Sequence, residues 1–153
     1  MPLDRIDFAL LRVLQEEARI ANKDLAARVG IAPSTCLERV RRLVRSGAIR
    51  GYRTEVDPRV LGIGLQAMVA IRLGQHARIS FEQLERELLQ LREVVSVYLL
   101  TGAQDLLVHV AVRDVSHLRD LLQTLTARGD VAHVETSLVF EVARAKTLPN
   151  YRD

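Results

Sequence analysis

Residues 33–46, PSTCLERVRRLVRS, hold four arginines but only one acidic residue. At the helical period of about 100° per residue, the apolar side chains of this segment fall within an arc of about 120°. That arc contains Cys36, Leu37, Val40, Leu43 and Val44. The arginines lie outside it, which predicts an amphipathic helix with a cationic outer face. Such a face suits solvent or, if the neighbouring elements allow it, phosphate groups.

The residues before this segment indicate whether its cationic face meets solvent or phosphate groups. A first helix is predicted behind Asp4 as N-cap, and a second over NKDLAARVG (22–30), with Asn22 as N-cap and Gly30 as its end. The second helix spans about two turns and needs its neighbours for stability. GIAP then leads into the cationic helix, which begins at Pro33 or at a capping box of Thr35 and Glu38. Two short helices joined by a turn with glycine are typical of a helix-turn-helix, whose second helix enters the major groove of DNA.

This motif predicts nine residues in contact with double-stranded DNA. The candidates for contact with bases, or beside them, are Ser34, Thr35, Glu38, Arg39 and Arg42. The candidates for phosphate contact, which gives affinity and register, are Lys23, Arg28, Arg41 and Arg45. Glu38 has an alternative partner in Arg42, four residues further along the helix. Cys36 lies on the apolar arc and is expected in the core, not as a reactive thiol.

Charge is distributed unevenly along the 153 residues. Residues 1–53 hold eleven Lys and Arg against six Asp and Glu, whereas residues 54–153 hold eleven against thirteen. This asymmetry favours two domains, the first of which is attracted to polyanions. The chain has neither an apolar run of about eighteen residues nor the apolar stretch of a secretory signal. Its single cysteine excludes an intrachain disulfide and favours the reducing cytoplasm.

The remaining hundred residues predict a sheet with two helices. The stretch GAIRGYRTEVDPRVLGIG (47–64) has the glycines and proline of a connector, and IRGYRTEV (49–56) within it predicts a short strand; the linker itself is assigned to 51–65 and leads to two β-α-β units. The strands are expected over 66–73, 94–102, 106–113 and 131–142, and the helices over 80–91 and 114–129. Ser80 and Asp114 are the expected N-caps and Gly129 the expected end of the second helix. The fold class is therefore α+β: a three-helix domain (1–50) and a ferredoxin-like βαββαβ domain (66–153).

Both faces of this sheet are expected to be apolar. In the strand over 106–113, the even-numbered residues are leucine and valine, whereas Leu107, His109 and Ala111 point the other way. Two helices cover only one face, so the second needs a partner. A two-fold homodimer is the commonest solution, and it suits the reading of two DNA half-sites.

The stretch LDRIDFALLRVLQEEARIANKDLAARVGIAPSTCLERVRRLVRSGAIRGYRTEVDPRVLG resembles the N-terminal module of the leucine-responsive regulatory protein (Lrp/AsnC, or feast/famine) family. The CLERVRRL core and the GxIxGYxxxxxPxxLG linker carry this resemblance, and the rest resembles the family's ligand-sensing module. The resemblance implies a cytoplasmic, nucleoid-associated transcriptional regulator without a cofactor, dimeric and commonly octameric. It also implies an amino-acid effector bound at contacts between dimers. Ala32 stands where the family usually has serine.

The family's effector loop is typically Gly, an acid or Asn, an aromatic residue and Asp. Here the loop is Gly102-Ala103-Gln104-Asp105, without the middle charge and ring. The resemblance assigns the effector's ammonium to Asp105 and its carboxylate to backbone N–H groups around Gly102, assisted by Thr101; Thr136 and Ser137 are candidates for the opposing wall. Such a site favours a neutral amino acid, aliphatic or aromatic. Alternatively, Gly102 and Asp105 only form the turn between two strands.

Two other functions are open. The histidines at 76, 109, 117 and 133 show no metal-ligand spacing, and no acid/base or nucleophile arrangement is present, which argues against an enzyme. Sirohaem decarboxylases nevertheless share this architecture, and His109 and His133 would be the residues to watch in such an enzyme. A third possibility is a DNA-organising protein that needs no effector.

Overall fold

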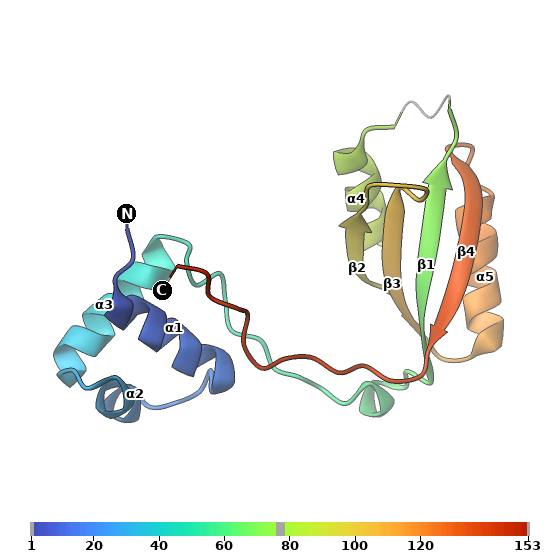
Figure 1. Ribbon diagram of the computed structural model, residues 1–153. Coiled ribbons are helices and arrows are strands. Elements are labelled where there is room, and N and C mark those ends of the chain that lie inside the picture. Colours follow the sequence, from blue (N-terminus) through green and yellow to red (C-terminus); the bar gives the residue numbers. More distant parts are fainter. Residues whose placement is uncertain (1, 76–78, 153) are drawn as a thin grey trace. The chain divides into compact units, whose positions relative to one another are not determined.

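The chain folds into two units, which the computed structural model describes over residues 2–75 and 79–152 (Figure 1). The helical unit comprises Met1–Glu55 together with Ala143–Asp153, and the sheet unit comprises Val56–Val142. The last eleven residues therefore group with the helices, whereas the sequence suggested that they belong with the sheet. In the described part of the chain no helix is long and apolar enough to span a membrane. His76 lies outside the described residues.

The helical unit contains α1 (Arg5–Glu16), α2 (Asn22–Val29) and α3 (Pro33–Arg45). Helix α1 begins as predicted at Asp4, whose carboxylate accepts a hydrogen bond from the backbone N–H of Asp7 at 2.9 Å. The carboxylate of Asp7 in turn accepts from the backbone N–H of Asp4 at 3.1 Å. This reciprocal pair forms a capping box and satisfies two N–H groups at the helix end.

The expected N-cap of α2 is wrong, whereas α3 begins at Pro33, the first of its two predicted starts. The N-cap of α2 is Ala21, and Asn22 is already helical; its amide donates to the carbonyl of Pro33 at 2.9 Å and so ties α2 to the start of α3. The N-cap of α3 is Ala32, with Pro33 as the first helical residue, so the alternative capping box within α3 is not used. Gly30 ends α2 at a positive φ of 75°, as predicted.

The core of the helical unit is formed by Leu10, Leu25, Ala26, Cys36 and Leu43. Two residues assigned to the buried arc of α3, Leu37 and Val44, are 40% and 45% exposed. The buried stripe of α3 is thus narrower than predicted and is centred on Cys36 and Leu43. Beside this buried stripe, polar side chains of α3 face α1 and contact it.

The sheet unit has the predicted ferredoxin-like fold. Its antiparallel sheet has the order β2-β3-β1-β4, and α4 (Phe81–Leu89) and α5 (Val115–Thr126) cover one face (Figure 1). The strands are β1 (Leu65–Leu73), β2 (Val94–Leu99), β3 (Leu106–Val112) and β4 (Val131–Val139). Ser80 and Asp114 cap the two helices as predicted. Helix α5 ends at Thr126, before the expected Gly129, and residues 50–57 form no strand; a 3-10 helix, η1 (Pro58–Leu61), follows them.

The covered face of the sheet holds the core, to which β1 and β3 contribute fully buried alanine, valine, isoleucine and leucine. The other face, called here the open face, is mixed: its two central strands place Met68 and Leu107 on it, but also Gln66 and His109. Cross-strand register places Ser96 of β2 and Ser137 of β4 on this face as well, and both lie on edge strands. The expectation of two apolar faces therefore holds only for a small patch around Met68 and Leu107.

Candidate nucleic-acid interface and ligand loop

Helix α3 presents a row of exposed polar residues away from α1. Ser34, Thr35, Glu38, Arg41 and Arg45 are all exposed. The carboxylate of Glu38 lies 3.5 Å from the guanidinium of Arg41 and 3.9 Å from that of Arg45. These side chains are 59–71% exposed, and such ion pairs contribute little in water. Both arginines are therefore available to an anionic partner.

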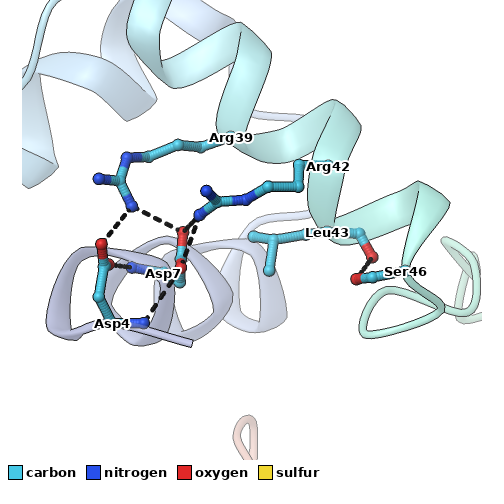
Figure 2. Close-up of polar contacts among 6 residues, drawn as sticks. All are labelled: Asp4, Asp7, Arg39, Arg42, Leu43 and Ser46. Atoms are coloured by element: carbon cyan, nitrogen blue, oxygen red, sulfur yellow. Dashed lines mark hydrogen bonds and ion pairs between the residues drawn. The ribbon is translucent and has the colours of Figure 1, made fainter. Parts of the chain in front are cut away.

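The other two arginines of α3 point toward α1 (Figure 2). Arg39 Nη1 donates to Asp4 Oδ2 at 2.7 Å and to Asp7 Oδ1 at 2.9 Å. Arg42 Nη2 donates to both carboxylate oxygens of Asp7 at 2.8 Å. We call these four residues, Asp4, Asp7, Arg39 and Arg42, the clamp. Glu38 pairs with Arg41 and Arg45, not with Arg42 as the alternative interpretation of the sequence had it.

The Asp7 side chain is only 1% exposed, so the clamp places a carboxylate in the interior together with the two guanidinium groups that compensate it. The backbone N–H of Asp7, and then the guanidinium of Arg39, lower the pKa of Asp4. The hydrogen bond from Arg39 to Asp4, and then the one to Asp7, raise the pKa of Arg39. The clamp joins the start of α1 to the middle of α3.

Asp7 is absent from the residues predicted to matter, yet the sequence carries a signal for it. Asp7, Leu10 and Leu14 recur at helical spacing along the inner face of α1. An acidic residue in an apolar stripe requires a cation from a neighbouring element. Cys36 lies nearby in the core, where burial raises the pKa of its thiol, in agreement with a packing role.

The other predicted phosphate contacts lie on α2. Lys23 and Arg28 are both exposed, and Arg28 donates to the carboxylate of Glu17 at 2.8 Å in an exposed pair. The C-terminal tail (143–152) adds further cations to this unit, and the backbone N–H of Leu148 donates to the side-chain oxygen of Gln15 at 2.9 Å. Over its whole sequence the helical unit has fourteen Lys and Arg against eight Asp and Glu, whereas the sheet unit has eight against eleven.

In the sheet unit, the loop that joins β2 to β3 contains the predicted effector residues. Thr101, Gly102 and Ala103 are exposed, and Gly102 has a φ of 115°, which favours glycine. Asp105 is bound to β1: its Oδ2 accepts from the N–H of Leu73 at 2.7 Å. Its own N–H donates to the carbonyl of Ile71 at 2.9 Å. One carboxylate oxygen of Asp105 therefore braces the loop, as the turn interpretation expects.

Gln104 is half-buried, and its side-chain oxygen is buried without a hydrogen-bond partner among the described residues. Thr136 and Ser137 do not join this loop in one copy of the chain. Thr136 lies opposite Val69, a core residue of the covered face, whereas Ser137 lies opposite Met68 on the open face. Because neighbours along a strand point to opposite faces, these two residues do not form one wall together.

The histidines of the sheet unit have partners of their own. His109 Nε2 lies 2.8 Å from the side-chain oxygen of Gln66, and His117 Nε2 lies 2.9 Å from the carboxylate of Glu93. His133 is exposed on β4. Over residues 2–75 and 79–152, no group of three His, Cys, Asp or Glu side chains is arranged to hold a metal ion.

Comparison with known proteins agrees with this division. Residues 3–50 match the winged helix-turn-helix DNA-binding family, and residues 66–148 match the Lrp/AsnC ligand binding domain. The HTH-type transcriptional regulator AldR of Mycobacterium tuberculosis is 46% identical over 143 residues, which cover 93% of this chain and 80% of that protein. The Leucine-responsive regulatory protein of Escherichia coli K12 is 41% identical over 140 residues, 91% of this chain and 85% of that protein.

Solved structures agree as well. A transcriptional regulator from Neisseria meningitidis, crystallised as a complex with L-Met, has a TM-score of 0.87 at 31% identity and covers 97% of both chains. The crystal structure of AldR from M. tuberculosis has a TM-score of 0.75 at 40% identity, over 96% of this chain and 100% of that one. From the helix-turn-helix, the ferredoxin-like domain and these relatives together, the chain belongs to the Lrp/AsnC family of DNA-binding transcriptional regulators.

Proposed function

We propose that the outer row of α3 recognises a specific DNA sequence and that an amino acid bound to the sheet unit modulates this recognition. The observation that carries the first part is the division of α3 into two sides. Its inner side is buried or bound to α1, whereas its outer side exposes two hydroxyl groups, one carboxylate and two guanidinium groups. Hydroxyl, carboxylate and guanidinium groups are those that pair with base edges and phosphates.

Within this row, Ser34, Thr35 and Glu38 lie in the N-terminal half of α3, the half that reaches base edges in helix-turn-helix proteins. Arg41 and Arg45, together with Lys23 and Arg28 of α2, contact phosphates and supply the part of the affinity that depends on salt. The net positive charge of the helical unit draws it to the duplex.

The effector is a neutral amino acid that binds at the β2–β3 loop. Asp105 uses Oδ2 to brace the loop, which leaves Oδ1 for the ammonium group of a ligand by a charge-assisted hydrogen bond. Ala103 and Gln104 add no charge that would hold a basic or acidic side chain. The complex of the Neisseria relative with L-Met, a neutral amino acid, supports this choice. We expect another copy of the chain to complete the site, since Thr136 and Ser137, which point to opposite faces of β4, do not form its second wall within one chain.

The protein is a cytoplasmic, nucleoid-associated regulator and not an enzyme. It forms a homodimer through the apolar centre of the open face, and dimers assemble further into an octamer. Its relatives are named as transcriptional regulators, which supports the regulatory role. Assembly and effector binding are linked, since a ligand that bridges copies stabilises the assembly to which it binds best.

One experiment tests the DNA-binding part directly: mapping of the genomic DNA bound in cells, with and without each amino acid in the medium. The wild type is compared with Arg41→Ala/Arg45→Ala and with Arg92→Ala, which removes an exposed arginine of the sheet unit. We expect a limited set of sites for the wild type and the control, and their loss in the double variant. Uniform coverage of the genome would instead indicate a DNA-organising protein, and unchanged sites in the double variant would contradict the assignment of α3.

The effector part is tested by calorimetry with all twenty amino acids on the wild type and on Asp105→Asn. Asparagine retains an oxygen that accepts the Leu73 N–H and loses the charge, so it separates ligand binding from loop bracing. A lost charge-assisted hydrogen bond is expected to weaken binding of a neutral amino acid by about 10-fold to 100-fold. Binding restricted to basic amino acids, or equal affinity in the variant, would contradict the proposal.

A further inference from the structure

The clamp divides the four arginines of α3 into two pairs with different surroundings. Among the described residues, Arg41 and Arg45 form ion pairs with the exposed carboxylate of Glu38, at 3.5 and 3.9 Å. Arg39 and Arg42 are held at 2.7–2.9 Å by Asp4 and Asp7 (Figure 2). Two arginines and two aspartates make the clamp neutral as a whole, so it adds no charge to the face that meets DNA.

We propose that Asp7 is a positioning residue for DNA recognition: it withholds Arg39 and Arg42 from the duplex and limits the cations that α3 offers to phosphates to Arg41 and Arg45. This proposal rests on the DNA-binding function of α3 proposed above. It concerns selectivity, because every guanidinium that is free to contact phosphate strengthens binding to all sequences alike.

The geometry of the clamp shows why Arg39 and Arg42 remain bound to Asp4 and Asp7. Asp7 is 1% exposed, and its carboxylate oxygens accept from Arg39, from Arg42 and from the backbone N–H of Asp4. If Arg42 turned to a phosphate, it would leave the Asp7 carboxylate, which is only 1% exposed, with less compensation, and this is costly for a buried charge. Arg39 has a second carboxylate, Asp4, at 2.7 Å, so its departure would break two ion pairs. An exposed partner such as Glu38 imposes no comparable cost on Arg41 or Arg45.

The test neutralises each arginine of α3 in turn, as Arg39→Gln, Arg41→Gln, Arg42→Gln and Arg45→Gln in the full chain. The readout is the slope of log affinity against log salt concentration for a duplex of unrelated sequence. Each phosphate contact contributes about 0.9 to this slope. We expect slopes smaller by about this amount for the variants at 41 and 45, and wild-type slopes for those at 39 and 42. Equal losses at all four positions would mean that the clamp opens on DNA, and would overturn the proposal.

A variant of the carboxylate makes the opposite prediction. Asp7→Asn keeps the size of the side chain and one acceptor oxygen but leaves Arg42 without a charged partner in the clamp. The freed guanidinium is expected to raise the salt slope on unrelated DNA by about 0.9 and to reduce the preference for the specific site. In the double variant Asp7→Asn/Arg42→Gln the slope returns to the wild-type value. A purely structural role for Asp7 would lower affinity without raising the slope, and that result would refute the proposal.

Thermal melting of every variant shows which of them are folded. Should Asp7→Asn not fold, the four glutamine variants decide the matter, because they leave both carboxylates in place. The proposed function fails in a different way: the variants at 41 and 45 would then keep wild-type slopes too. A difference in salt slope between the variants at 41 and 45 and those at 39 and 42 is therefore specific to the withholding of Arg39 and Arg42.

Discussion

Replacing Asp7 with alanine is expected to unfold the helical unit at temperatures at which the sheet unit is still folded. The substitution leaves Arg42 without a carboxylate partner and Arg39 with one of two. Removal of one partner from a buried ion pair costs about 3–5 kcal/mol, and the lower end applies here because the guanidinium groups left behind are 22% and 37% exposed. The substitution also removes half of the capping box at the start of α1, since the N–H of Asp4 loses its acceptor.

A cost of this size is large for a small unit. For a domain of 60–100 residues, each kcal/mol shifts the melting temperature by about 4–8 °C, so the expected shift is at least about 12 °C. Scanning calorimetry measures it in the full chain, where the transition of the sheet unit serves as the internal reference. Asp24→Ala is the matched control, because Asp24 is exposed in the first turn of α2 and contributes at most about 1 kcal/mol there. A shift in Asp7→Ala no larger than that of the control would refute the assignment of a buried, compensated carboxylate.

Three further predictions concern the sheet unit. The hydrogen bond from Arg128 lowers the pKa of Asp130. The Asp130 carboxylate therefore stabilises the sheet unit at pH values above the ordinary carboxyl pKa of about 4, and this stabilisation is lost as the pH falls through the lowered pKa. Arg128→Gln should flatten the fall in melting temperature measured between pH 6 and pH 2. A Cβ on Gly64 would overlap a backbone carbonyl oxygen, so Gly64→Ala should cost about 1–3 kcal/mol in denaturant unfolding, whereas Gly74→Ala, which has room, should cost less; equal costs would contradict this. If the full-length chain forms the homodimer proposed above, Leu107→Asp should convert it to monomers in sedimentation, because the variant introduces an unpaired carboxylate at the centre of the open face; a wild type that is itself monomeric would refute the proposed dimer.

The fold was largely predictable from local patterns. Alternating valines in β3, the Ser80 and Asp114 caps and the repeated β-α-β order each carry a local signal, and all of them agree with the structure. The strand expected at 49–56 is absent because β-forming residues such as Tyr52 and Val56 need a partner strand, and no strand of the described residues pairs with them.

The candidate site was predictable only in part. Helical projection places Arg39 and Arg42 among the polar residues of α3, but it does not tell whether a polar side chain faces solvent or a carboxylate on another helix. That distinction depends on the contact between α1 and α3, more than thirty residues apart. The same limit applies to Asp105, whose bond to Leu73 spans 32 residues. Long-range pairing of charges and hydrogen bonds is set by the tertiary fold and leaves little trace in a local pattern.

The grouping of the tail with the helices makes the sheet unit an insertion within the helical unit. The chain enters the sheet through β1 and leaves it through β4, and the register pairs Gln66 with Val139, so entry and exit lie side by side. Folding of the sheet therefore closes most of the loop between Gln15 and Leu148, which are 133 residues apart. Halving the effective length of such a loop lowers its entropic cost by about 0.6 kcal/mol. The α1–tail contact of the DNA-binding unit therefore forms at a lower entropic cost once the sheet unit has folded.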